Sequence, residues 1–182
     1  MSVDVVVSSE TIVAGVVRID PSLLRFPAVP PPTGIAPVDV LGAFARGDAE
    51  DFHLVTSQEI VESALSSLDR VYGFDFEHRD LVHREIERLL LVSGGGVVST
   101  ARALQVPSNV GSAASEALSC AVSADLGHPR TVVVVTDDAA ATRLSAWRPP
   151  GVPWSPESHL QILDPLAFNA LVEEVRRRRR RI

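Results

Sequence analysis

Two adjacent carboxylates, Asp137 and Asp138, follow the buried-type run Val132 to Val135. Consecutive β-branched residues without polar alternation are typical of a strand that is covered on both faces of a parallel sheet. Ligands of open α/β sheets bind beyond the carboxyl ends of the strands, so this acidic pair marks the first candidate site. Asp138 precedes Ala-Ala-Ala-Thr and has two open interpretations: an active-site or metal-binding carboxylate, or a helix N-cap.

A run of six arginines near the end of the chain is the second group with evident binding chemistry. Residues 1–175 carry 11 arginines against 23 acidic residues, a net charge of −12, and the chain has no lysine. Such a body repels a phosphate backbone, so nucleic-acid binding would be local, at a metal site or at the arginines. The alternative is a solvated helix end whose cations suit the helix dipole. The run comprises Arg176, Arg177, Arg178, Arg179, Arg180 and Arg181.

Length and composition predict one soluble domain in a reducing compartment. The single cysteine, Cys120, stands among apolar residues and is interpreted as a buried structural thiol. The beginning of the sequence has no basic region before an apolar run, so we expect a cytoplasmic protein without a signal peptide or membrane span. The five histidines are too dispersed to predict a zinc site.

Segments with strand and helix patterns alternate along nearly the whole chain. This alternation predicts a parallel sheet with helices on its faces. A proline-rich segment between the first two helices is interpreted as a surface loop or flap. The expected strands lie at 4–8, 52–55, 132–135 and 160–163, and the expected helices begin near residues 9, 37, 56, 77, 112, 139 and 164.

Local patterns fix several helix boundaries. Thr56 and Glu59 have capping-box spacing, and the helix at 77–91 is expected to turn Leu81, Val82 and Ile86 inward. Gly94 to Gly96 follows a helix and lacks the Lys-Ser/Thr of a phosphate loop, so we interpret it as a helix C-cap and turn.

The order of these segments resembles the PIN domain, the ribonuclease fold of many bacterial toxin–antitoxin toxins. Val5 to Val17 looks like its first strand and helix, and Val132 to Asp138 looks like its strand ending in Val-Thr-Gly-Asp. Ile162 to Val175 resembles its closing strand and helix. The resemblance implies a three-layer α/β/α fold with a mainly parallel central sheet over residues 1–175, a proline-rich insertion at 18–33 and an arginine-rich tail at 176–182.

The resemblance also implies a site in which three or four carboxylates hold Mg²⁺ or Mn²⁺ for RNA cleavage. Only Asp138 matches a family acid. The other family positions carry Ser8, Ser63, Ala113 and Ala114, and acids that could substitute for them are Glu10, Glu62, Glu116 and Asp137.

Two functional hypotheses follow from this pattern. In the first, a PIN-like protein has lost cleavage and binds RNA or a protein partner, such as an antitoxin-like protein. In the second, the chain is an active Mg²⁺- or Mn²⁺-dependent endoribonuclease that uses the shifted acids. A third interpretation is an unrelated α/β binding domain. A homodimer is expected from the resemblance alone.

Overall fold

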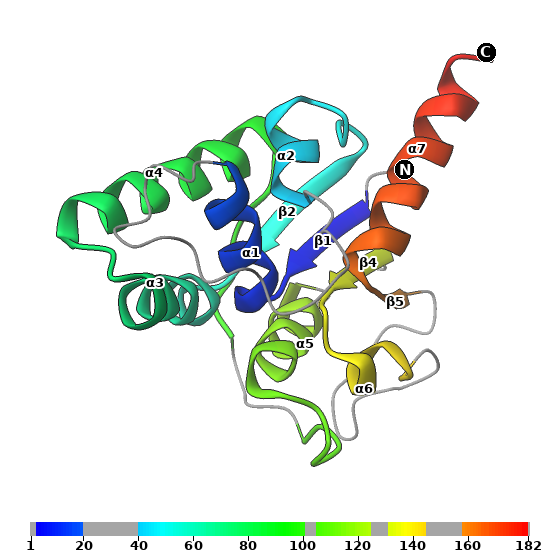
Figure 1. Cartoon of the computed structure of the whole chain (residues 1–182). Helices are drawn as coiled ribbons and strands as arrows, with labels where there is room; N and C mark the ends of the chain where they lie inside the picture. Colours follow the sequence, from blue (N-terminus) through cyan, green and yellow to red (C-terminus); the bar gives the residue numbers. More distant parts are fainter. Residues whose placement is uncertain (1–2, 20–39, 101–104, 125–130, 145–157, 182) are drawn as a thin grey trace.

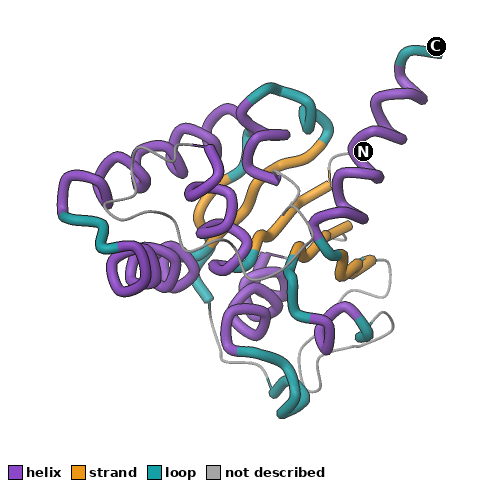
Figure 2. Tube along the Cα trace, viewed as in Figure 1, coloured by secondary structure: helices purple, strands orange, loops and turns teal. Residues whose placement is uncertain are grey.

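A single five-stranded sheet forms the centre of the protein (Figures 1 and 2). The computed structural model describes residues 3–19, 40–100, 105–124, 131–144 and 158–181. Within these, every neighbouring strand pair is parallel and the strand order is β3-β2-β1-β4-β5, which confirms the predicted parallel sheet. The strands are β1 (Val3–Val7), β2 (Phe52–Thr56), β3 (Gly96–Val97), β4 (Thr131–Val135) and β5 (His159–Leu163).

Helices cover both faces of this sheet and complete the predicted three-layer α/β/α fold. The chain passes from β1 to β2 to β3 in one direction and then returns past β1 to β4. The helix of the returning connection packs on β1, β4 and β2, and it also contacts the helices that directly follow β1 and β2. The helices are α1 (Ser9–Ile19), α2 (Val40–Ala45), α3 (Gln58–Tyr72), α4 (Phe76–Ser93), α5 (Ser112–Ala124), α6 (Ala139–Thr142) and α7 (Pro165–Arg179).

The core centres on the two middle strands and on a group of three aromatic rings. Residues 132–135 of β4 are fully buried, as their pattern predicts. On the face that carries α2 and α7, the ring of Phe168 stacks on Phe44 at a centroid distance of 6.1 Å and meets Phe52 edge-on at 5.5 Å. These rings join the last helix to the first half of the chain.

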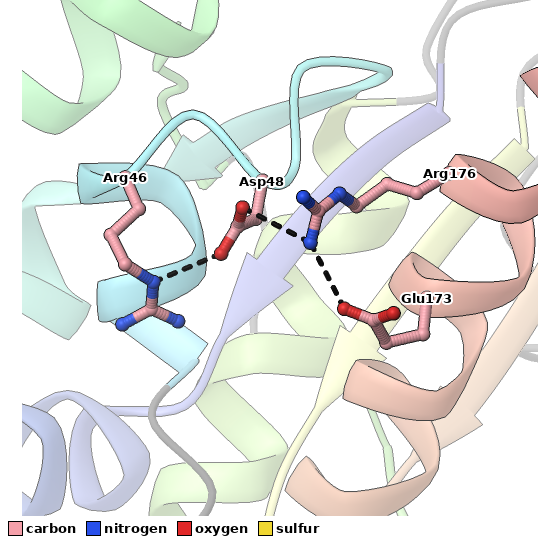
Figure 3. Close-up of polar contacts among 4 residues, drawn as sticks. All are labelled: Arg46, Asp48, Glu173 and Arg176. Atoms are coloured by element: carbon pink, nitrogen blue, oxygen red, sulfur yellow. Dashed lines mark hydrogen bonds and ion pairs between the residues drawn. The ribbon is translucent and has the colours of Figure 1, made fainter. Parts of the chain in front are cut away.

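Ion pairs on the same side join α7 to the connection between α2 and β2 (Figure 3). Nη1 of Arg176 lies 3.2 Å from Oδ1 of Asp48, and Arg46 approaches the other oxygen of Asp48 at 2.9 Å. Arg179 pairs with Glu50 at 2.6 Å and also with Asp51. We call this contact between the arginines of α7 and the acids at 48–51 the α7 junction.

Several predicted boundaries are correct and others are wrong. Asp164 caps α7 as expected, and Gly94 ends α4 in the left-handed region at φ +70°. The cap of α3 is Ser57, whose Oγ accepts from Ile60 N, because Thr56 is still paired in β2. Leu81 points outward and is 53% exposed. Helix α1 continues to Ile19, two residues into the predicted insertion, whose remaining residues lie outside the described ranges.

Among the described helices, none combines the length and the apolar character needed to cross a lipid bilayer.

Candidate functional site

The carboxyl ends of β1 and β4 form the point at which the sheet order reverses. The two strands are neighbours, yet the chain leaves β1 toward β2 and leaves β4 toward β5. The backbone N–H of Ser8 donates to the carbonyl of Val135 at 2.9 Å, so the segments after both strands lie together. This is the position at which open α/β sheets bind ligands. The residues around this point come from the ends of β1 and β4 and from the starts of α1 and α5. We call them the carboxyl edge.

Asp138 is committed to backbone N–H groups through both carboxylate oxygens. Its Oδ1 accepts from Ala140 N at 2.7 Å and Ala141 N at 3.0 Å, which caps α6. Its Oδ2 accepts from Gly111 N at 2.6 Å, which ties the edge to the turn before α5. The N–H donors of Ala141 and Gly111 are the main cause of a pKa below the ordinary aspartate range. The predicted capping role is therefore the one observed.

Ser8, where the resemblance leads us to expect the first acid, acts as a structural hydroxyl. It is completely buried, and its Oγ lies 3.0 Å from the hydroxyl of Thr11 and 3.4 Å from Thr11 N. These contacts satisfy polar groups in the first turn of α1. A carboxylate is absent at this position, and the buried hydroxyl supplies neither negative charge nor an exposed ligand.

Glu10, in the first turn of α1, stands among other carboxylates. Partial desolvation raises the pKa of Glu10, and the negative charges of Asp138, Asp137 and Glu116 raise it further, in that order. The structure therefore brings four of the five predicted site acids into one electrostatic neighbourhood. The neighbourhood is acidic, so it attracts cations and basic groups.

The pKa of Asp137 is affected by Asp164, the N-cap residue of α7. Desolvation raises the pKa of Asp137, and the charge of Asp164 raises it further. Asp164 follows β5, and Asp137 follows the adjacent strand β4. Both acids therefore lie at the same edge of the sheet, and Asp164 extends the acidic region toward β5.

Glu116 reaches the edge from α5. Its Oε2 atom is shielded from solvent and has no hydrogen-bond partner among the described residues. Ala113 and Ala114, two positions where the resemblance leads us to expect acids, are buried. Glu116 is consequently the acid that α5 contributes to this region.

The remaining predicted acid, Glu62, lies apart from this group. It is exposed on α3 and accepts a hydrogen bond from Gln58 Nε2 at 2.8 Å. Its charge is not among those that raise the pKa of Glu10. Ser63 beside it is half-buried. A step of one residue along a helix rotates a side chain by about 100°, which separates Glu62 from the direction of Ser63.

As arranged, the acids of the carboxyl edge do not fit a metal centre. Among the residues that the structure describes, no three His, Cys, Asp or Glu side chains are grouped to share a metal ion. The oxygens of Asp138 face N–H donors, whereas a hard cation requires several oxygens directed at one point. The arrangement is suited to electrostatic binding of a positively charged group.

The arginines lie at the other end of the strands. Arg179 pairs with Asp51, which immediately precedes β2, and Val3 at the start of β1 donates to the carbonyl of Asp51. The arginine run is thus at the amino edge of the sheet. The first four arginines are the last residues of α7, so this part of the predicted tail is helical and continues the domain.

Three residues of the carboxyl edge were missed in the sequence: Gly111, Thr136 and Asp164. Gly111 holds Asp138 through its N–H, and Thr136 Oγ1 accepts from Asp138 N at 3.2 Å. Gly111 gave no signal, because its contact joins residues 27 positions apart. Asp164 could have been found, since the carboxyl ends of all parallel strands share one edge.

Comparisons with protein-family models, with curated proteins and with solved structures found no significant match to this chain.

Proposed function

We propose that this chain is a PIN-like domain that acts by binding RNA or a protein partner, without cleaving RNA. One observation carries the proposal: Asp138, the single acid that matches the family pattern, uses both oxygens to cap α6 and hold Gly111. The three N–H groups occupy most of the roughly four lone-pair sites of this carboxylate, so little of it is left for a metal ion. The proposed role relates the chain to toxin–antitoxin ribonucleases through scaffold rather than chemistry.

The charges of the protein suggest which surface would meet which partner. The carboxyl edge carries Glu10, Glu116, Asp137 and Asp138 and suits a basic segment of a protein, such as an antitoxin-like partner. RNA would be repelled there and would have to meet the arginines at the amino edge. Binding of the two partner classes therefore depends on different ends of the sheet.

A second candidate is an active Mg²⁺- or Mn²⁺-dependent endoribonuclease. The specific observation in its favour is the raised pKa of Glu10, which results from desolvation and from the charges of Asp138, Asp137 and Glu116. Perturbed carboxylates gathered at a sheet edge are a recognised sign of a functional site. In this candidate, Glu62 would have no part, because it lies outside the group.

An RNA cleavage assay separates the two candidates. Labelled RNA is incubated with the full chain in Mn²⁺, in Mg²⁺ and in EDTA, and the products are resolved by gel electrophoresis. The proposal expects intact RNA under all three conditions. Metal-dependent cleavage by the parent that is lost in both Asp138→Asn and Glu10→Gln would establish the endoribonuclease instead.

The matched control is Glu77→Gln, which makes the same chemical change at an exposed position of α4. A true carboxyl-edge activity survives this substitution. Cleavage that is equal in the parent and all three variants comes from a contaminating nuclease and does not count for the endoribonuclease.

A further inference from the structure

The contacts of the six arginines divide them into two sets. Arg176 and Arg179 are anchors of the α7 junction, bound to Asp48, Glu50 and Asp51. Arg178 pairs with Glu174 one turn earlier in its own helix. The other three have no ion pair with any residue in the described part of the chain: Arg177, Arg180 and Arg181.

These three arginines share one side of the helix. Helix α7 ends at Arg179, and the N–H groups of Arg180 and Arg181 donate to the carbonyls of Arg176 and Arg178, so both residues continue its last turn. Arg177, Arg180 and Arg181 have the spacing i, i+3 and i+4, which confines them to an arc of about 100°. All three are exposed. We call them the arginine face.

We propose that the arginine face binds consecutive phosphates of single-stranded RNA. Guanidinium groups pair with phosphate oxygens through two parallel hydrogen bonds, and arginine-rich runs of this length are typical nucleic-acid contacts. The last turns of α7 extend beyond the sheet (Figure 1), so a strand can reach them. This inference rests on the proposed function in taking RNA as the partner.

The geometry favours RNA over an acidic protein segment. Carboxylates of the protein converge in pairs on single guanidiniums of this helix: Arg179 binds both Glu50 and Asp51. A phosphate backbone instead presents successive anions on one chain, so three guanidiniums of a single turn can be occupied together. Each neutralised phosphate also releases condensed counterions, a gain that isolated carboxylates lack.

The test measures RNA affinity against salt concentration, in EDTA so that metal-dependent cleavage cannot interfere. A fluorescein-labelled single-stranded RNA of mixed sequence is titrated with the full chain, and anisotropy gives the binding constant. The triple variant R177Q/R180Q/R181Q should bind more weakly. The slope of log K against log salt should become shallower by about 2, since each phosphate contact in a single strand contributes about 0.7.

The matched control is R79Q/R84Q/R88Q, which removes three arginines of α4, Arg79 half-buried and the other two exposed, and changes the net charge equally. Its slope should equal that of the parent. The inference is overturned if the two triple variants behave alike, if the arginine-face variant binds as the parent does, or if the parent binds no RNA. It is also overturned if a polyglutamate peptide competes as effectively as RNA, which would assign the face to acidic proteins.

The RNA titration and the RNA cleavage assay can fail independently of each other. Loss of RNA affinity in the arginine-face variant supports the inference whether or not the parent cleaves RNA in Mn²⁺. If the parent does not cleave RNA and the arginine-face variant binds RNA as the parent does, the arginine face is not an RNA-binding site. The proposed function then remains for a protein partner.

Discussion

The two edges of the sheet place similar acids in opposite surroundings. At the α7 junction, Asp48, Glu50 and Asp51 meet arginines at ion-pair distance. At the carboxyl edge, Glu10 meets other carboxylates, and its pKa rises through desolvation and their charges. At the α7 junction, arginines of the protein balance the negative charges and hold α7 in place. At the carboxyl edge, the negative charges lie together and repel one another, which is expected at a site that binds an external positive charge.

Acidic residues alone do not distinguish the carboxyl edge from the α7 junction. Both regions are acidic in sequence, and both lie at ends of strands. What separates them is which groups the fold directs at the carboxylates: guanidiniums from α7 at one edge, and Asp137, Asp138 and Glu116 at the other. We expect this difference to appear in the free energy of unfolding of the following variants.

The largest effect is expected when the aromatic packing of α7 on the core is removed. Phe168→Ala deletes a fully buried ring that packs on Phe44 and Phe52. The free energy of unfolding should fall by about 3–5 kcal/mol in urea denaturation. Leu166→Ala, which truncates a 61% exposed side chain of the same helix, should change it by less than about 0.5 kcal/mol. Equal effects would mean that the rings do not fasten α7.

A smaller loss is expected at the carboxyl edge from Asp138→Ala. The substitution leaves the N–H groups of Ala140, Ala141 and Gly111 without their acceptor, and the unfolding free energy should fall by about 1–2 kcal/mol. Asp138→Asn keeps one cap oxygen and should lose less.

The pH dependence of this second effect has a definite sign. Because the folded state holds the pKa of Asp138 below its ordinary value of about 4, the carboxylate stabilises the protein above that value. The advantage of the parent over Asp138→Ala should fade as the pH falls from about 4 toward the lower folded pKa. An advantage that grows on acidification would contradict the capping role.

The ion pairs of the α7 junction should contribute less to the free energy of unfolding than the aromatic ring of Phe168 does. Arg176→Gln combined with Arg179→Gln removes the contacts to Asp48, Glu50 and Asp51 and should lower the unfolding free energy by about 1 kcal/mol at low salt. The loss should shrink at high salt, where exposed charges are screened. The control Arg177→Gln with Arg180→Gln should have almost no effect, and a loss equal to that of the anchors would refute the division of the run.

The smallest effect, and the only gain, is expected from Glu10→Gln. The folded state raises the pKa of Glu10 and so binds its proton more tightly than the unfolded chain. Stability therefore falls as the pH rises from about 4.3, the ordinary glutamate value, through the higher folded pKa. At neutral pH the variant should be more stable by up to about 0.5 kcal/mol, measured by thermal unfolding. A loss of stability would mean that Glu10 has a cationic partner.

Much of the fold could be predicted because its signals are local. The run Val132 to Val135 has no polar alternation, and it proved to be a strand buried on both faces. Asp164 before Pro165 is a strong cap sequence, and it begins α7. Thr56 was misassigned because a hydroxyl three residues before a glutamate resembles a cap, whereas pairing with β3 keeps this residue in the sheet. Leu81 was misassigned because helical spacing does not reveal how much of a face is covered.

The candidate site was predictable in position but only partly in composition. The end of β4 could be located from its sequence, and the nearby acids Glu10, Glu116 and Asp137 could be proposed. The commitment of Asp138 to Gly111 could not, since it depends on how the turn before α5 meets the strand end. The separation of the arginine run into anchors and an exposed face likewise depends on contacts 128 and 129 positions apart in the chain.

The pairing of β1 with β4 has a consequence for folding kinetics. Val3 lies beside Thr131, and the register continues to Val7 beside Val135, so the centre of the sheet joins segments that are distant in sequence. Such contacts require closure of a long loop and slow the search for the native topology. Glu10 and Asp137 meet only after this closure, so their mutual repulsion opposes a late step. The carboxyl edge therefore forms only when this long-range pairing has been made.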